Sequence, residues 1–125
     1  MRLGAMVLAV AVWAAPQSAA LAAPGDGFAP FWQAFTVALA KDDKAALARM
    51  VVLSPELDEA SPLTFARFHA DYLGPKTRQC LAKAKPVRDV DGLGKANYSA
   101  FCGELDFSFY QSGGGWKLTG IGPND

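Results

Sequence analysis

The sequence predicts one α+β domain, in which amphipathic helices come first and an antiparallel sheet of about four strands follows. Between residues 28 and 84, apolar residues recur with the 3.6-residue period of helices. After Pro86 the period changes to two, which is the alternation of half-buried strands. We therefore expect a curved sheet with one apolar face, and the amphipathic helices cover that face.

Residues 1–22 have the pattern of a secretory signal. Arg2 precedes an unbroken apolar run of eleven residues, Ala5–Ala15, and Ala20-Leu21-Ala22 supplies the small-x-small pattern before a cleavage site. Eleven residues are too few to cross a membrane, which takes about 20 helical residues. We expect cleavage after Ala22. That cleavage leaves a single domain of residues 23–125, exported to the periplasm or the extracellular space, without a transmembrane segment.

Two cysteines, Cys80 and Cys102, lie in the mature chain. In an oxidising compartment, an even pair in a small domain is more often a disulfide than a metal or catalytic site. The two cysteines and His69 are too few ligands for a metal. We expect a disulfide that stabilises the fold by about 3 kcal/mol, and we expect neither a metal nor a cofactor.

Two helices are expected before residue 54. The first spans residues 28–41, with Pro30 in its first turn, where a missing N–H costs little. The second begins after Asp42 or Asp43 as N-cap and ends at Leu53-Ser54-Pro55. The apolar side of the first consists of Phe28, Phe31, Trp32, Phe35 and Leu39, and that of the second of Leu47, Met50 and Val51.

Two more helices follow a loop at residues 54–62. Ser61 as N-cap and Pro62 at the first helical position form a typical start for the third helix, and Gly74-Pro75 ends it. The fourth helix spans about residues 76–84, with Cys80 and Leu81 facing inward. The inward side of the third helix consists of Phe65, Phe68, His69, Tyr72 and Leu73.

Four strands are expected over residues 87–90, 97–102, 104–111 and 116–121. Residues 91–94 turn the first hairpin. Gly103-Glu104 suits a two-residue turn with glycine first. A four-residue loop at residues 112–115 joins the last two strands. The expected pairs are Cys102 with Leu105, Ala100 with Phe107, Tyr98 with Phe109, and Phe109 with Leu118.

This register separates an apolar inner face from a mostly polar outer face. A slip of one residue would exchange the faces and bring Asp106 inside. The apolar side chains of the outer face are compatible with a monomer or a weak dimer. The inner face consists of Tyr98, Ala100, Cys102, Leu105, Phe107, Phe109, Trp116 and Leu118. The outer face consists of Asn97, Ser99, Phe101, Asp106, Ser108, Tyr110, Lys117, Thr119 and Ile121.

Several segments carry a family resemblance: residues 31–35, 43–47, 65–68, 75–78, 103–107 and 115–121. Through them the mature chain resembles the nuclear transport factor 2-like and ketosteroid isomerase-like superfamily, and more narrowly its small secreted bacterial members. The resemblance implies a cone-shaped fold with a pocket between helices and sheet. Isomerases of this superfamily use a carboxylate base and a Tyr–Asp acid pair in that pocket. The expected inner face has no carboxylate, so none of those positions transfers to this chain.

Any pocket of this kind is expected between the helices and the apolar sheet face. His69 is the candidate catalytic base, because a histidine titrates near neutral pH. The alternative is a histidine at the edge of the core, hydrogen-bonded to a backbone carbonyl or a tyrosine hydroxyl. The aromatic side chains would then be core packing. The expected pocket residues are Trp32, Phe35, Phe65, His69, Tyr72, Tyr98, Phe107 and Trp116.

A run of basic residues without an interposed acid offers a second surface for an anionic partner, although a solvated helix face has the same pattern. The run consists of Lys76, Arg78, Lys83, Lys85 and Arg88. The whole chain has 12 basic and 12 acidic side chains. Removal of Arg2 with the signal leaves the mature chain close to neutral, so nucleic acid is not an expected partner.

These observations favour an exported, non-enzymatic binding or accessory domain. Its partner would be a small apolar ligand or an envelope protein, bound in the helix–sheet pocket or on the basic helix surface. One alternative is an isomerase-like or hydrolytic enzyme that uses His69 with Tyr72 or Tyr98. Another is a secreted inhibitor or immunity protein, with a protruding loop or apolar patch at residues 54–61 or 113–115.

Overall fold

In the computed structural model of the chain, the described residues are 25–52 and 64–124. The predicted signal, the loop at residues 54–62 and the predicted helix start at Ser61 and Pro62 lie outside them. The helices are α1 (Phe28–Lys41), α2 (Lys44–Arg49), α3 (Phe65–Tyr72) and α4 (Pro75–Lys83). The strands are β1 (Val87–Val90), β2 (Ala96–Cys102), β3 (Leu105–Ser112) and β4 (Gly115–Pro123).

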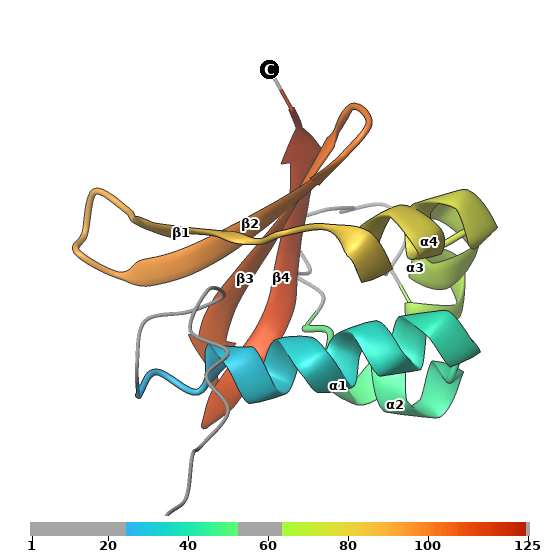
Figure 1. Cartoon of the computed structure of the whole chain (residues 1–125), viewed down its shortest axis with the longest axis horizontal. Coiled ribbons are helices and arrows are strands. Elements are labelled where there is room, and N and C mark those ends of the chain that lie inside the picture. Colours follow the sequence, from blue (N-terminus) through green and yellow to red (C-terminus); the bar gives the residue numbers. More distant parts are fainter. Residues whose placement is uncertain (1–24, 53–63, 125) are drawn as a thin grey trace, which may run out of the picture.

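The strands form one antiparallel sheet in the order β1-β2-β3-β4, which does not close into a barrel. In Figure 1, α1 and α2 lie below β1 and β2, beside the lower ends of β3 and β4, and α3 and α4 lie at the right of the sheet. The predicted α+β class, with helices first and a four-stranded sheet after them, is confirmed.

The first two helices differ from the prediction only at the end of α2. The N-cap is Asp43, whose Oδ1 accepts from the Ala46 backbone N–H at 3.1 Å. Val51, expected on α2, instead forms a parallel bridge with Leu118 of β4. The Val52 N–H donates to the Leu118 carbonyl at 2.9 Å, and this bond holds the chain extended. Residues 50–52 thus cover part of the outer edge of β4.

Local capping explains where α3 and α4 begin. The hydroxyl of Thr64 accepts from the Arg67 N–H at 3.2 Å, so Thr64 is the N-cap of α3. The predicted start of this helix at Ser61 and Pro62 is therefore wrong, because Thr64 has an extended backbone and the helix begins at Phe65. Pro75 occupies the first turn of α4, where its missing N–H needs no partner. Leu81 of α4 is buried, as expected, whereas Cys80 is exposed at the edge of the helix.

The predicted pairing of the central strands is confirmed. Tyr98 pairs with Phe109, Ala100 with Phe107 and Cys102 with Leu105. Gly103 has a φ of 62°, as the first position of the predicted two-residue turn requires. The next connection is tighter than expected: Ser112 pairs with Gly115, and Gly113 and Gly114 alone form the turn.

One predicted position on the outer face is wrong. The register of β3 and β4 shifts between Ser108 and Phe109, so that Phe109 pairs with Leu118 but Ser108 pairs with Gly120. The shift is a β-bulge, and an extra residue reverses the faces of the strand beyond it. Ile121 therefore pairs with Phe107 and packs against the core. Asp106, by contrast, pairs with Phe101 on the outer face, so the one-residue slip does not occur.

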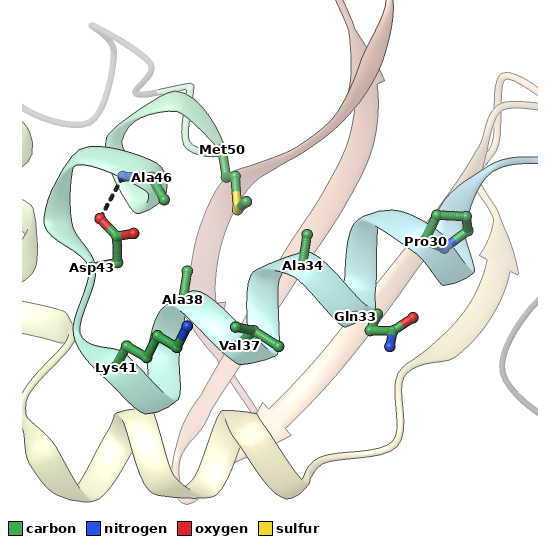
Figure 2. A pocket seen from close by; sticks show the side chains of 9 residues that line it. All are labelled: Pro30, Gln33, Ala34, Val37, Ala38, Lys41, Asp43, Ala46 and Met50. Atoms are coloured by element: carbon green, nitrogen blue, oxygen red, sulfur yellow. Dashed lines mark hydrogen bonds between the residues drawn. The ribbon is translucent and has the colours of Figure 1, made fainter.

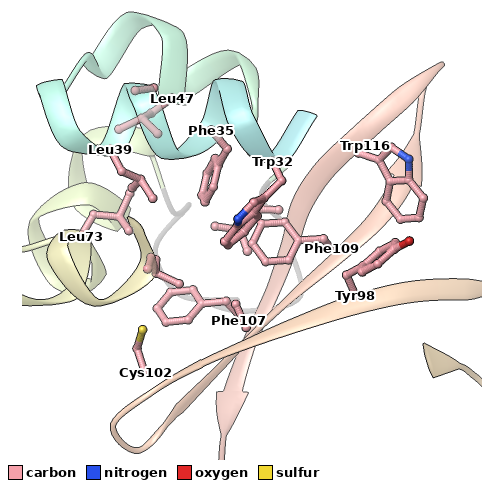
Figure 3. Close-up of a cluster of buried hydrophobic side chains, with 14 of the residues drawn as sticks. Trp32, Phe35, Leu39, Leu47, Leu73, Tyr98, Cys102, Phe107, Phe109 and Trp116 are labelled. Atoms are coloured by element: carbon pink, nitrogen blue, oxygen red, sulfur yellow. The ribbon is translucent and has the colours of Figure 1, made fainter. Parts of the chain in front are cut away.

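Aromatic rings fill the space between α1 and the sheet (Figure 3). The rings of Phe28 and Tyr98 stack, with centroids 3.6 Å apart. Trp32 and Phe35 contact Phe109 edge-on, with centroids 5.5 and 5.4 Å apart. Phe28, Phe35, Tyr98 and Phe109 are each 0% exposed. The interior is therefore packed with side chains where the family resemblance implies a pocket.

A disulfide links α4 to the sheet. Cys80 and Cys102 are joined with a Cα–Cα distance of 5.9 Å, as predicted from the compartment and the even count. Among the described residues, no helix has the length and apolar character to cross a membrane.

Candidate functional site

The structure divides the eight expected pocket residues into two groups. The first group belongs to the sealed core, where each side chain is 6% exposed or less; it consists of Trp32, Phe35, Tyr98, Phe107 and Trp116. The second group lies half-buried on α3 and consists of Phe65, His69 and Tyr72. Of the eight, only Tyr72 lines one of the cavities described below.

Two concavities of the described residues have the volume of ligand sites, which is several hundred Å³. One, of ≈ 560 Å³, lies between Tyr72 of α3 and the ends of β3 and β4, and its lining is mixed polar and apolar. The other, of ≈ 440 Å³, lies between α1 and α2 and is mostly apolar. A third space, beside Phe68 and Leu118, measures ≈ 10 Å³ and holds about one water at most.

We call the concavity between α1 and α2 the α1–α2 groove. Figure 2 shows Ala46 and Met50 of the α2 segment across from Ala34 and Ala38 of α1. Val37 is 47% exposed at its side. Ala38, at 4% exposed, also belongs to the core, whereas Gln33, Ala34 and Val37 of the lining are exposed. Its lining consists of Pro30, Gln33, Ala34, Val37, Ala38, Lys41, Asp43, Ala46 and Met50.

His69 belongs to a charged cluster at the junction of three helices. Its Nε2 donates to Asp42 Oδ1 at 2.7 Å, and Arg78 Nε lies 3.6 Å from the same oxygen. Arg78 also donates to the Leu73 carbonyl at 2.7 Å. The hydrogen bond from His69, together with the nearby positive charges, lowers the pKa of Asp42 below its ordinary value. His69 therefore has a hydrogen-bond partner at the core edge, but the partner is a carboxylate, which the sequence analysis did not include.

Asp26 forms a second polar cluster at the opposite end of α1. Its carboxylate accepts from the Tyr98 hydroxyl at 2.5 Å and from the Phe28 N–H at 2.9 Å. The Asp26 carbonyl accepts from Trp116 Nε1 at 2.7 Å, and Arg88 Nε lies 3.9 Å from the carboxylate. One residue thus ties the segment before α1 to β1, β2 and β4. The sequence analysis missed it, because only an acid two residues before a helix hinted at its role.

The turn between β1 and β2 presents an exposed apolar side chain. Leu93 is 93% exposed, and Asp91 Oδ1 accepts from both the Leu93 and the Lys95 backbone N–H at 2.9 Å. These bonds, led by that from Lys95, lower the pKa of Asp91. The sequence analysis also missed this feature. Its one signal was a leucine between two glycines, outside both periodic patterns.

The basic run is smaller as a surface than its sequence suggests. Arg78 pairs with Asp42, and Arg88 with Asp26. The exposed remainder is Lys76, Lys83 and Lys85. Two of the five positive charges of the run are thus paired with aspartates of the fold.

No protein-family model, curated protein or solved structure matches the chain. Within residues 25–52 and 64–124, no group of three His, Cys, Asp or Glu side chains is placed to hold a metal ion.

Proposed function

We propose that the chain is an exported, non-catalytic binding domain whose α1–α2 groove receives the apolar face of a helix from an envelope protein. The observation that carries the proposal is the groove itself, an apolar concavity of ≈ 440 Å³. The filled interior supports the same choice, because the aromatic residues expected to line a pocket pack against one another instead.

The openness of the groove favours a macromolecule over a small ligand. Small-molecule sites commonly bury about 70–90% of the ligand. The residues at the mouth of the groove are exposed, among them Gln33, Ala34 and Val37. A small ligand there would keep one side in water. A helix of a second protein would cover the groove and bury both apolar surfaces.

The shape of the lining suits a helix in particular. Ala34 and Ala38 are four residues apart and therefore lie on one face of α1, and Ala46 faces them from α2. Such short side chains let a second backbone approach closely. The lining from Pro30 to Lys41 extends about 16 Å along α1 at 1.5 Å per residue, which matches about three turns of a partner helix.

Export is part of the proposal. The Cys80–Cys102 disulfide is compatible with an oxidising compartment, and residues 1–22 have the pattern of a secretory signal. Membership of the nuclear transport factor 2-like superfamily remains a prediction of the sequence analysis.

The enzymatic alternative has one observation in its favour, the short contact between His69 and Asp42. A carboxylate that orients an imidazole is common in catalytic sites. However, His69 lines none of the three cavities, and Arg78 shares the same carboxylate. We assign the cluster to holding α3 and α4 against the end of α1.

The test is native mass spectrometry of the full chain taken from its envelope fraction, in wild type and two variants. Ala34→Glu puts a charge on the groove, whereas Ala40→Glu puts the same charge on an exposed position of α1 outside it. We expect a protein partner on wild type and on Ala40→Glu, and at least tenfold less of it on Ala34→Glu, because an unpaired charge must be desolvated. A wild-type chain without any bound protein would contradict the proposal. An equal amount of bound partner on wild type and both variants would contradict it as well.

A further inference from the structure

We infer that the turn between β1 and β2 is a preformed docking tip, whose Leu93 side chain enters an apolar pocket on a protein partner. The tip consists of residues 91–95. It shares no residue with the α1–α2 groove. The inference therefore goes beyond the proposed function, and an experiment can refute either proposal without affecting the other.

Exposure alone would not justify this inference, because single apolar residues are common on protein surfaces. Leu93 is nevertheless extreme at 93% exposed, and Val90 beside it at the end of β1 is 50% exposed. Figure 1 shows that the β1–β2 hairpin extends away from the helices, past the N-terminal end of α1. The tip is therefore accessible to a second protein.

The second observation is that hydrogen bonds hold the tip in one conformation. The Asp91 N–H donates to the Lys95 carbonyl, and the Gly94 N–H donates to the Asp91 carbonyl, both at 2.9 Å. The Asp91 carboxylate accepts from the Leu93 and Lys95 N–H groups. Gly94 has a φ of 78°, which closes a three-residue hairpin loop in the way glycine permits.

Contacts from β3 support the same turn. The Tyr110 hydroxyl lies 3.4 Å from the second oxygen of Asp91. Lys95 Nζ lies 5.7 Å from the centroid of the Tyr110 ring. A tip held this way has little conformational freedom left to lose on binding, and such preorganisation raises affinity without adding contacts.

The tip is better suited than the free edge of β1 to contact a protein partner. The Val90 N–H is already bonded to Asp89 Oδ1 at 2.8 Å. Pro86, directly before β1, has no N–H to offer. Charged residues and a proline on an edge strand discourage the addition of another strand. Leu93 is the most exposed apolar side chain of this arm, ahead of Val87 at 54% and Val90 at 50%.

Charge favours a protein pocket over a membrane. Arg88 pairs with Asp26, and near the tip Lys95 lies among Asp89 and Asp91, so the arm has no excess of positive charge to attract anionic lipids. One leucine without such attraction holds a protein only weakly at a bilayer. A rigid loop with one projecting apolar side chain instead suits an apolar pocket of matching size, as in complexes of preorganised partners.

The test begins with a photoreactive phenylalanine analogue placed at position 93 of the full chain, in cells that export it. The matched control carries the analogue at position 48, where Ala48 is exposed on α2 outside the groove. We expect a discrete protein adduct from position 93 and none from position 48. The captured protein is then purified and titrated with the unlabelled chain.

In that titration Leu93→Ser should bind about 30-fold more weakly than wild type, which is the loss expected for one buried leucine. Asp91→Ala should bind about tenfold more weakly, because a tip without the Asp91 hydrogen bonds is flexible and becomes ordered only on binding. The control variant Ala48→Ser should bind with the affinity of wild type. Three crosslinking results would overturn the inference: a lipid adduct, an adduct to a second copy of the chain, or no protein adduct. Equal affinity of Leu93→Ser would overturn it as well.

A separate measurement needs no partner. Backbone order parameters of the free protein should be near 0.85 for residues 92–94 in wild type and should fall in Asp91→Ala. Values below about 0.6 in wild type would show that the tip is not preformed and would refute the inference.

Discussion

At the scale of single residues, two aspartates hold the ends of α1. Asp26 joins the start of the helix to Tyr98 and Trp116. Asp42 joins its end to His69 and Arg78. Asp42 also has a φ of 51°, in the left-handed region, which aspartate tolerates better than most residues. Both aspartates therefore act through partners that are distant in sequence.

The Asp42 cluster predicts a pH dependence of stability. The pKa of Asp42 is lowered in the folded chain, mainly by the hydrogen bond from His69. The folded state thus favours the charged form. This contribution to stability is present above the unfolded pKa of about 3.9 and is lost as the pH falls through the lower folded value.

Urea unfolding of wild type and Asp42→Asn between about pH 2 and 6 measures this dependence. Wild type should be more stable than the variant above about pH 4, and the difference should shrink at lower pH. Asp71→Asn is the control, because its partner Arg67 lies on the same exposed helix face. If the difference in the free energy of unfolding between wild type and Asp42→Asn stays constant down to pH 2, Asp42 does not have this role.

At the scale of elements, the hairpin turns position the strands. Gly113 and Gly114 have φ values of 64° and 94°, and together they close the β3–β4 hairpin. Gly103 closes the preceding hairpin with a φ of 62°. Because these turns set the register, they determine which side chains reach the core.

Gly114→Ala tests this dependence on the turn. Nothing lies within 4 Å of the position a Cβ would take, so the expected loss of about 1 kcal/mol comes from backbone strain at positive φ. Gly92→Ala is the matched control, because that site is equally open and has no positive φ. Thermal unfolding of both variants gives the comparison. Equal effects would mean that strain is not the cause.

At the scale of the whole molecule, the helices and the sheet are joined by a packed aromatic core and one covalent link. The disulfide connects α4 to the last residue of β2. The core connects α1 to the central strands through Phe35 and Phe109. Because the interior is filled, our two proposals place recognition on outer surfaces, namely the groove and the tip.

Removal of the disulfide should lower stability without changing the fold. The Cys80→Ser, Cys102→Ser double variant should lose about 3 kcal/mol in urea unfolding, because its unfolded chain regains the freedom of the closed loop. The sequence separation of 22 residues sets the size of that loop. Circular dichroism should show unchanged secondary structure. A loss of sheet signal in the double variant would show that the core cannot form the fold alone.

The sequence by itself determined the bounds of α1, the central strand pairs and the disulfide. These features follow from local periodicity, from glycines that permit particular turns, and from an even cysteine count. Only the tertiary structure decided the partner of His69, the role of Asp26 and the bulge that turns Ile121 inward. It also decided that aromatic rings fill the interior and that Leu93 projects from the fold. These features depend on side chains far apart in the chain, and no local pattern records which distant groups will meet.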